Sequence, residues 1–140
     1  MDTIFALASA PGKAGISIVR LSGPLAINVA EKLTKSKLKE KKPNLRVIYD
    51  SDNHFIDQAL ILIFRKPYSF TGENVVEFHL HGSSAVVSSV IKLLANFKGL
   101  RSAEAGEFTR CALENGKIDL AQVEGLACLL YTSPSPRDRG

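Results

Sequence analysis

The sequence predicts an α+β fold, in which helices pack on a mixed or antiparallel sheet, for a chain of 140 residues. Short β-favouring segments dominate the middle of the chain, helical periodicity appears around them, and the two kinds of element do not alternate regularly. Hydrophobic residues make up 45% and charged residues 23%, which is the balance of a folded chain. The length suits one main domain rather than two full-sized ones.

The first part of the chain predicts a strand, a loop, a second strand and a helix. The segments before the helix are, in order, TIFALAS at 3–9, APGKAG at 10–15 and ISIVRLSG at 16–23. We expect Ser22 to cap a helix that begins near Pro24. In the second strand Arg20 shares one face with Ile16 and Ile18, and this pattern favours a guanidinium that reaches water at the strand end.

The rest of the chain predicts a three-strand meander and then helices around one short strand. The meander strands are at 45–50, 57–64 and 74–80. A helix follows, capped by Ser83 or Ser84 and ended before Gly99. A short strand, a helix and the start of another helix complete the readable chain, at 100–104, 106–116 and 119–127.

The basic character of the chain is concentrated in one segment. Residues 32–42 hold six lysines against one glutamate, with no aromatic residue between them for base stacking, and the formal net charge of the chain is +4. A solvated helix end and loop is therefore favoured over an RNA-facing patch. Cys111 and Cys128 form no CxxC pair, which fits a reducing compartment. Because no apolar run approaches the ~20 residues of a membrane span and no leader is evident, we expect a cytoplasmic protein without membrane contact.

The last thirteen residues differ from the rest. From Cys128 the helical pattern gives way to a Ser/Pro-rich string, CLLYTSPSPRDRG, which reads as a linker. The string also resembles the translated read-through of a sequencing adaptor. We therefore expect 128–140 to be a non-native tail without function, and the natural chain to continue beyond about residue 127.

The stretch VVEFHLHG at 75–82 raises the question of a metal site. In a strand Glu77, His79 and His81 share one face, and such a set can bind iron or zinc. No cysteine or acidic cluster elsewhere completes a convincing coordination sphere, so hydrogen-bonded histidines are favoured and no metal is predicted.

Motifs for nucleotide hydrolysis or nucleophilic catalysis are absent from the sequence. It contains no GxxxxGK[ST], GxGxxG or GxSxG segment, and we predict no catalytic residue. Lys117 follows Gly116, which is predicted to end a helix, and its ordinary role there is to complement the helix dipole.

Three long segments resemble one family in order and spacing. They are DTIFALASAPGKAGISIVRLSGP, YSFTGENVVEFHLHGS and LRSAEAGEFTRCALENGKIDLAQVEGLA. Together they resemble the N-terminal domain of the tRNA modification GTPases MnmE, also called TrmE, from Asp2 to about Ala127. The resemblance implies a folate-binding and dimerisation domain at 1–117, similar in fold to the folate-binding domain of the glycine-cleavage aminomethyltransferases. It also implies the start of a truncated helical domain at 118–127.

The resemblance implies which residues bind the cofactor, 5-formyl-tetrahydrofolate or methylene-tetrahydrofolate. The family's folate contacts match Arg20, Glu77 and Lys117. A carboxylate accepts both the ring N–H and the amino group of a pterin, which suits Glu77. Arg20 and Lys117 offer donors to carbonyl or carboxylate groups of the folate. His79 and His81 are then expected to support the pocket wall.

The resemblance also implies ligands and partners of the full-length enzyme on which this chain alone is not expected to act. In the family, the full-length enzyme is a homodimer that uses GTP, Mg²⁺ and K⁺ and works with an MnmG-type flavoprotein on the wobble uridine of tRNA. The GTPase motif and the C-terminal CxGK motif are missing from this sequence. Two alternatives remain open: a free-standing aminomethyltransferase-like enzyme, and a basic tRNA-binding module that uses residues 32–42.

Overall fold

A computed structural model describes residues 2–8, 15–81 and 83–117. Six strands form one sheet: β1 (Thr3–Leu7), β2 (Ser17–Ser22), β3 (Asn44–Tyr49), β4 (Phe55–Phe64), β5 (Val75–Leu80) and β6 (Leu100–Ser102). The helices are α1 (Ala26–Thr34), α2 (Ser84–Ala95) and α3 (Glu107–Glu114). The strand order is β3-β4-β5-β2-β1-β6, and only the β1–β6 pair is parallel. The predicted α+β fold with a mixed sheet is therefore confirmed.

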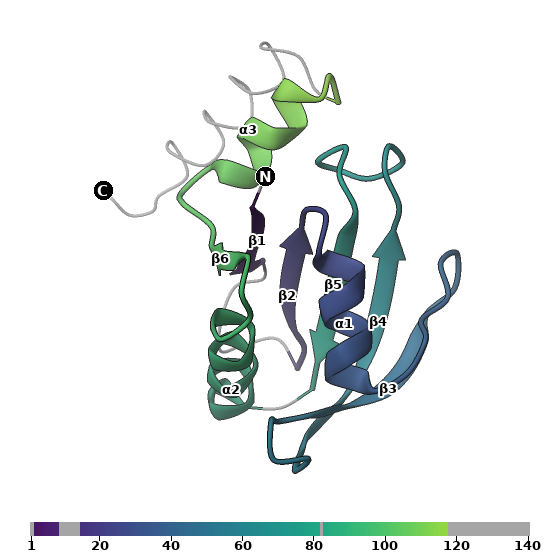
Figure 1. Ribbon diagram of the computed structural model, residues 1–140, viewed down its shortest axis with the longest axis vertical. Coiled ribbons are helices and arrows are strands. Elements are labelled where there is room, and N and C mark those ends of the chain that lie inside the picture. The colour runs from purple at the N-terminus through teal and green to yellow at the C-terminus, as the bar shows by residue number, and fades with distance from the viewer. Residues whose placement is uncertain (1, 9–14, 82, 118–140) are drawn as a thin grey trace.

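The main core lies between one face of the sheet and the helices α1 and α2 (Figure 1). Strand alternation places Val19 and Leu21 of β2 and Phe78 of β5 on this face, where all three are fully buried. Leu33 of α1 and Leu94 of α2 belong to the same hydrophobic cluster. The alternate residues of β2 and β5 therefore point their side chains to the opposite face of the sheet.

The start of α1 differs from the prediction. Ser22 does not cap this helix: it is the last residue of β2, and its hydroxyl bonds to that of Thr71 at 2.7 Å. Gly23, with φ of 140°, turns the chain before Leu25 at the N-cap position. The N–H of Leu25 donates to Oγ1 of Thr3 at 2.9 Å, so a neighbouring strand satisfies this group.

The other predicted elements appear close to their expected limits. Ser83 is the N-cap residue of α2, although its side chain makes no capping hydrogen bond. The segment 32–42 forms the end of α1 and the connection to β3, as predicted, and most of its residues are exposed. The predictions for 118–127, for 128–140 and for most of the loop at 10–15 lie outside the described residues. No helix among the described residues is long and apolar enough to cross a membrane.

Candidate functional site

An ion pair joins β2 and β5 on the sheet face opposite α1 and α2. Arg20 and Glu77 are directly opposite each other in the antiparallel register. The Nε and Nη2 atoms of Arg20 donate to Oε2 of Glu77 at 2.9 and 2.7 Å. The side chains are only 28% and 16% exposed. The strand pattern predicted a guanidinium that simply reaches water; the side chain does keep this partial exposure, but the sheet also pairs its guanidinium with a carboxylate of the neighbouring strand.

His79 supports the same carboxylate. Its Nε2 atom donates to Oε1 of Glu77 at 3.1 Å, from two residues further along β5. Partial burial raises the pKa of Glu77, but the hydrogen bonds from Arg20 and His79 outweigh this effect, and the pKa lies below its ordinary value. Glu77 is therefore a carboxylate at neutral pH, already oriented by two donors.

His81 does not join this cluster. It follows the end of β5, and its backbone N–H donates to the carboxylate of Asp57 at 2.8 Å. Its ring Nδ1 donates to the carbonyl oxygen of Gln58 at 2.9 Å. The predicted shared face thus brings Glu77 and His79 together, whereas His81 binds the adjoining strand β4.

Two aromatic rings approach the Arg20 guanidinium. The ring centroids of Phe70 and Phe108 each lie 6.0 Å from its Cζ atom, which is within cation–π range. Phe70 comes from the β4–β5 loop and Phe108 from α3. Sequence reasoning missed both residues, because no sequence spacing links a loop phenylalanine and a helix phenylalanine to a strand arginine.

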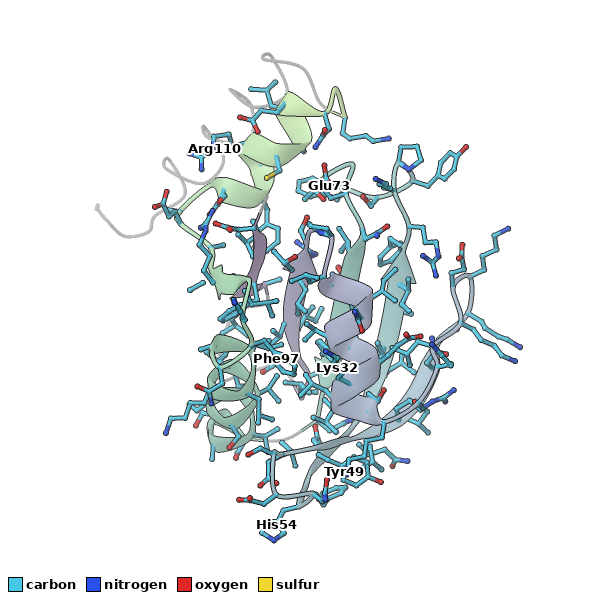
Figure 2. The ribbon with its side chains drawn as sticks, viewed as in Figure 1. Lys32, Tyr49, His54, Glu73, Phe97 and Arg110 are labelled. Carbon is cyan, nitrogen blue, oxygen red and sulfur yellow. The ribbon has the colours of Figure 1, made fainter. Side chains whose placement is uncertain are left out.

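The β4–β5 loop and α3 are fastened to each other. The side-chain amide of Asn115, just after α3, donates to the carbonyl oxygen of Thr71 at 2.9 Å and to the carboxylate of Glu73 at 3.3 Å. Figure 2 shows Glu73 on the loop beside α3. Gly72 has φ of 85°, and a Cβ atom there would lie 2.6 Å from that of Asn115. This close contact ties the loop that carries Phe70 to the helix that carries Phe108.

A second ion pair attaches α3 to β6. The guanidinium of Arg101 donates to both carboxylate oxygens of Glu107, at 2.8 Å for the Nη1–Oε1 contact. The backbone N–H of Glu104 also donates to Glu107 at 2.9 Å. The hydrogen bonds from Arg101 lower the pKa of Glu107 to about 2. These groups are structural: they fix the helix that carries Phe108.

Lys117, the third predicted folate contact, lies outside the Arg20–Glu77 cluster. It follows α3, its side chain is exposed, and its backbone N–H donates to the carbonyl oxygen of Ala112 at 2.8 Å. Within the described part of the chain its ammonium forms no ion pair. The structure therefore brings two of the three predicted residues together.

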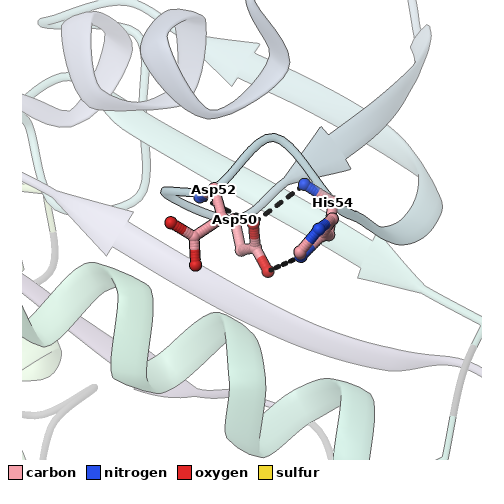
Figure 3. A group of neighbouring side chains, drawn as sticks. All are labelled: Asp50, Asp52 and His54. Atoms are coloured by element: carbon pink, nitrogen blue, oxygen red, sulfur yellow. Dashed lines mark hydrogen bonds and ion pairs between the residues drawn. The ribbon is translucent and has the colours of Figure 1, made fainter.

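A separate group of potential ligands occupies the β3–β4 turn. Ligand atoms of Asp50, Asp52 and His54 lie within 4.8 Å of one another (Figure 3). One oxygen of Asp50 accepts the backbone N–H groups of Asp52 and His54, each at 2.8 Å. These bonds stabilise the turn. An exposed cluster of this kind is ordinary without an ion, so we assign it no binding role.

Comparisons with known proteins agree with one another. A family model described as "GTP-binding protein TrmE N-terminus" matches residues 3–117. A tRNA modification GTPase MnmE from Roseobacter denitrificans is 58% identical over 130 residues, which are 93% of this chain and 30% of the relative. One from Cereibacter sphaeroides is 54% identical over 139 residues, 99% of this chain and 32% of the relative. A mitochondrial 5-taurinomethyluridine-[tRNA] synthase subunit GTPB3 from Danio rerio is 44% identical over 139 residues, 99% of this chain and 28% of the relative. The chain thus spans about a third of the length of these relatives.

Proposed function

Because the chain belongs to the TrmE N-terminal domain family, we propose that it is the tetrahydrofolate-binding and dimerisation module of a GTPase that modifies the wobble uridine of tRNA. The observation that carries the proposal is the Arg20–Glu77 pair on the sheet face opposite α1 and α2. This pair combines a carboxylate for a pterin with a cation for the folate's carbonyl or carboxylate oxygens.

The hydrogen bonds around Glu77 define what a ligand must displace. A carboxylate offers about four acceptor positions. Arg20 occupies two of them and His79 a third. A pterin with two adjacent N–H donors needs two positions, so one bond of Arg20 has to be released. In the proposed complex Glu77 keeps its bond from His79, and the freed donor of Arg20 turns to an oxygen of the ligand.

The surroundings of the pair suit a flat, partly charged ligand. The rings of Phe70 and Phe108 lie near the guanidinium and offer surfaces against which a pterin can stack. Lys117, in this proposal, meets a carboxylate of the folate from the end of α3. The bound 5-formyl- or methylene-tetrahydrofolate supplies a one-carbon unit, while these residues bind and orient it.

The proposal extends to the assembly. Large apolar side chains are exposed on the described surface, among them Ile16 at 42% and Leu45 at 53%, and a second copy of the chain would bury such groups. GTP, Mg²⁺ and K⁺ are assigned to parts of the full-length protein beyond this sequence. We place that protein in the cytoplasm, with tRNA and an MnmG-type flavoprotein as partners.

Calorimetric titration of 5-formyl-tetrahydrofolate into the chain tests this function. Glu77→Gln is expected to weaken binding by roughly ten- to a hundredfold, because it removes the charged acceptor. Asp52→Asn removes an exposed carboxylate on the β3–β4 turn and is expected to leave the affinity unchanged. Equal affinity in Glu77→Gln and the unaltered chain would contradict the assigned site. One-carbon transfer to glycine by this chain alone would instead favour the aminomethyltransferase alternative.

A further inference from the structure

An open groove lies beside the end of β4. It has a volume of about 700 Å³ and is formed by the segment before β3 and by the end of β4 with the loop that follows. Its lining includes the cations Lys41, Lys42 and Arg65 and the aromatic residues Phe64 and Tyr68. We propose that this basic groove binds a single-stranded segment of RNA. The choice of RNA as the ligand rests on the proposed function, in which tRNA is a partner, but the groove uses none of the residues of the folate site, so the two proposals can fail separately.

The charges of the groove favour a polyanion. Its one acidic residue, Glu40, is already paired with Arg65. Lys41 and Lys42 are exposed and form no ion pair with any described residue. Both ammonium groups are therefore available to neutralise phosphates, which releases counterions from a nucleic acid.

The aromatic residues provide what the lysine segment lacks in the sequence. Tyr68 is 84% exposed and Phe64 is 39% exposed, so both rings are accessible to a ligand. A hydrogen bond of 2.8 Å from the N–H of Tyr68 to the carbonyl oxygen of Arg65 holds this part of the loop as a turn. Exposed rings beside unpaired cations are the combination that stacks bases and tracks the backbone of a single strand.

The shape of the site favours RNA over a lipid surface as the ligand. The distinction is needed because basic and aromatic residues also bind lipid surfaces. A helix that binds a membrane surface buries an exposed apolar face at the headgroup boundary. Here the residues line a hollow whose volume lies within the range of roughly 300–1,000 Å³ typical of sites for organic ligands. A base can enter such a hollow while its flanking phosphates meet Lys41 and Lys42.

Fluorescence anisotropy with a labelled RNA of about twelve unpaired nucleotides tests the proposal, at several salt concentrations. Each phosphate contact contributes roughly 0.7 to the salt slope of single-strand binding. The double substitution Lys41→Gln/Lys42→Gln is therefore expected to reduce the slope by about 1.4. The matched control is Lys92→Gln/Lys98→Gln, which removes two exposed lysines of α2 and the turn after it and is expected to leave the slope unchanged.

Stacking is tested at Tyr68. Because this side chain is exposed, its substitution is expected to leave the fold intact, and circular dichroism checks this. Tyr68→Ala is expected to weaken RNA binding by roughly 5- to 150-fold, whereas Tyr68→Phe keeps the ring and the affinity. Equal losses in the two lysine pairs would overturn the proposal. The proposal would also be overturned if the chain bound phosphatidylserine vesicles in a way that depends on Tyr68 but did not bind RNA. Loss of a dimer in Tyr68→Ala with unchanged RNA affinity would show that the groove is instead an interface between copies.

Discussion

Arg20 and Glu77 face each other across β2 and β5, and one oxygen of Glu77 accepts both Nε and Nη2 of Arg20. Both side chains are mostly buried, so the charge of each is compensated mainly by the other. Any ligand that binds Glu77 through two donors must therefore compete with Arg20. The same pair is therefore expected to contribute both to the stability of this sheet face and to its proposed affinity for folate.

A double-mutant cycle on the pair is expected to give a coupling free energy of about 0.5–3 kcal/mol. Arg20→Gln or Glu77→Gln alone leaves a partly buried charge without its partner, while the double substitution removes both charges. Denaturant unfolding of the four proteins measures this. The control cycle uses Glu40 and Arg65, which are 42% and 51% exposed and are expected to couple by only about 0.2–1 kcal/mol. Coupling no stronger in the first cycle would contradict the structural role of the pair.

Acid stability is expected to depend on Glu107. Its pKa in the folded chain, about 2, lies below the ordinary 4.5, so the unfolded chain binds this proton first as the pH falls. The stabilisation from Glu107 is thus complete above about pH 4.5 and is lost as the pH falls towards 2. Unfolding of Glu107→Gln between these values should show a shallower pH dependence than the unaltered chain. Arg101→Gln removes the main cause of the shift and should flatten the same window; an unchanged slope in both variants would refute this explanation.

Gly72→Ala is expected to destabilise the chain more than Gly106→Ala. Both glycines have positive φ, 85° and 75°, so alanine is strained at each. At Gly72 the added Cβ would also meet Asn115 at 2.6 Å, whereas at Gly106 nothing lies within 4 Å. Thermal unfolding of the two variants isolates the contact between the β4–β5 loop and α3. Equal losses of stability would show that this contact is unimportant.

Phe78→Ala is expected to cost about 3–5 kcal/mol of unfolding free energy. The ring is fully buried at the centre of the core between the sheet and the helices, so its removal leaves a cavity. Phe55→Ala removes the same ring from a position that is 64% exposed at the start of β4, and should change stability by no more than about 0.5 kcal/mol. Chemical denaturation measures the free energy of unfolding of both variants, and similar losses of this free energy would contradict the described packing.

Much of the fold was predictable because local patterns determine it. The alternation in β5 correctly placed Glu77 and His79 on one face, and the resemblance to the TrmE N-terminal family is confirmed. The Arg20–Glu77 pair was not predictable from the strand pattern, because the two residues are 57 positions apart in the sequence and the register depends on the whole sheet. Ser22 was misassigned as a helix cap for a related reason. Its hydroxyl is used by Thr71, from a loop far along the chain.

Contacts between distant segments also limited what could be predicted about the candidate sites. The lysine segment seemed to lack aromatic neighbours, but the fold brings Phe64 and Tyr68 to it from another part of the sequence. Lys117 was assigned to folate by resemblance, and this assignment stays a prediction. Residue types and strand faces follow from local sequence, whereas contacts between distant segments require the assembled sheet.

The most direct test of the folate site is a titration of 5-formyl-tetrahydrofolate monitored by the Nε–H signals of isotope-labelled arginine side chains. The Nε–H of Arg20 donates to Glu77, so we expect a saturable shift of this signal as the bond is released or redirected. Arg101, which is bound to Asp2 and Glu107, should keep its signal. Saturable shifts confined to other arginines, or binding with an unmoved Arg20 signal, would contradict the placement of folate at the Arg20–Glu77 pair.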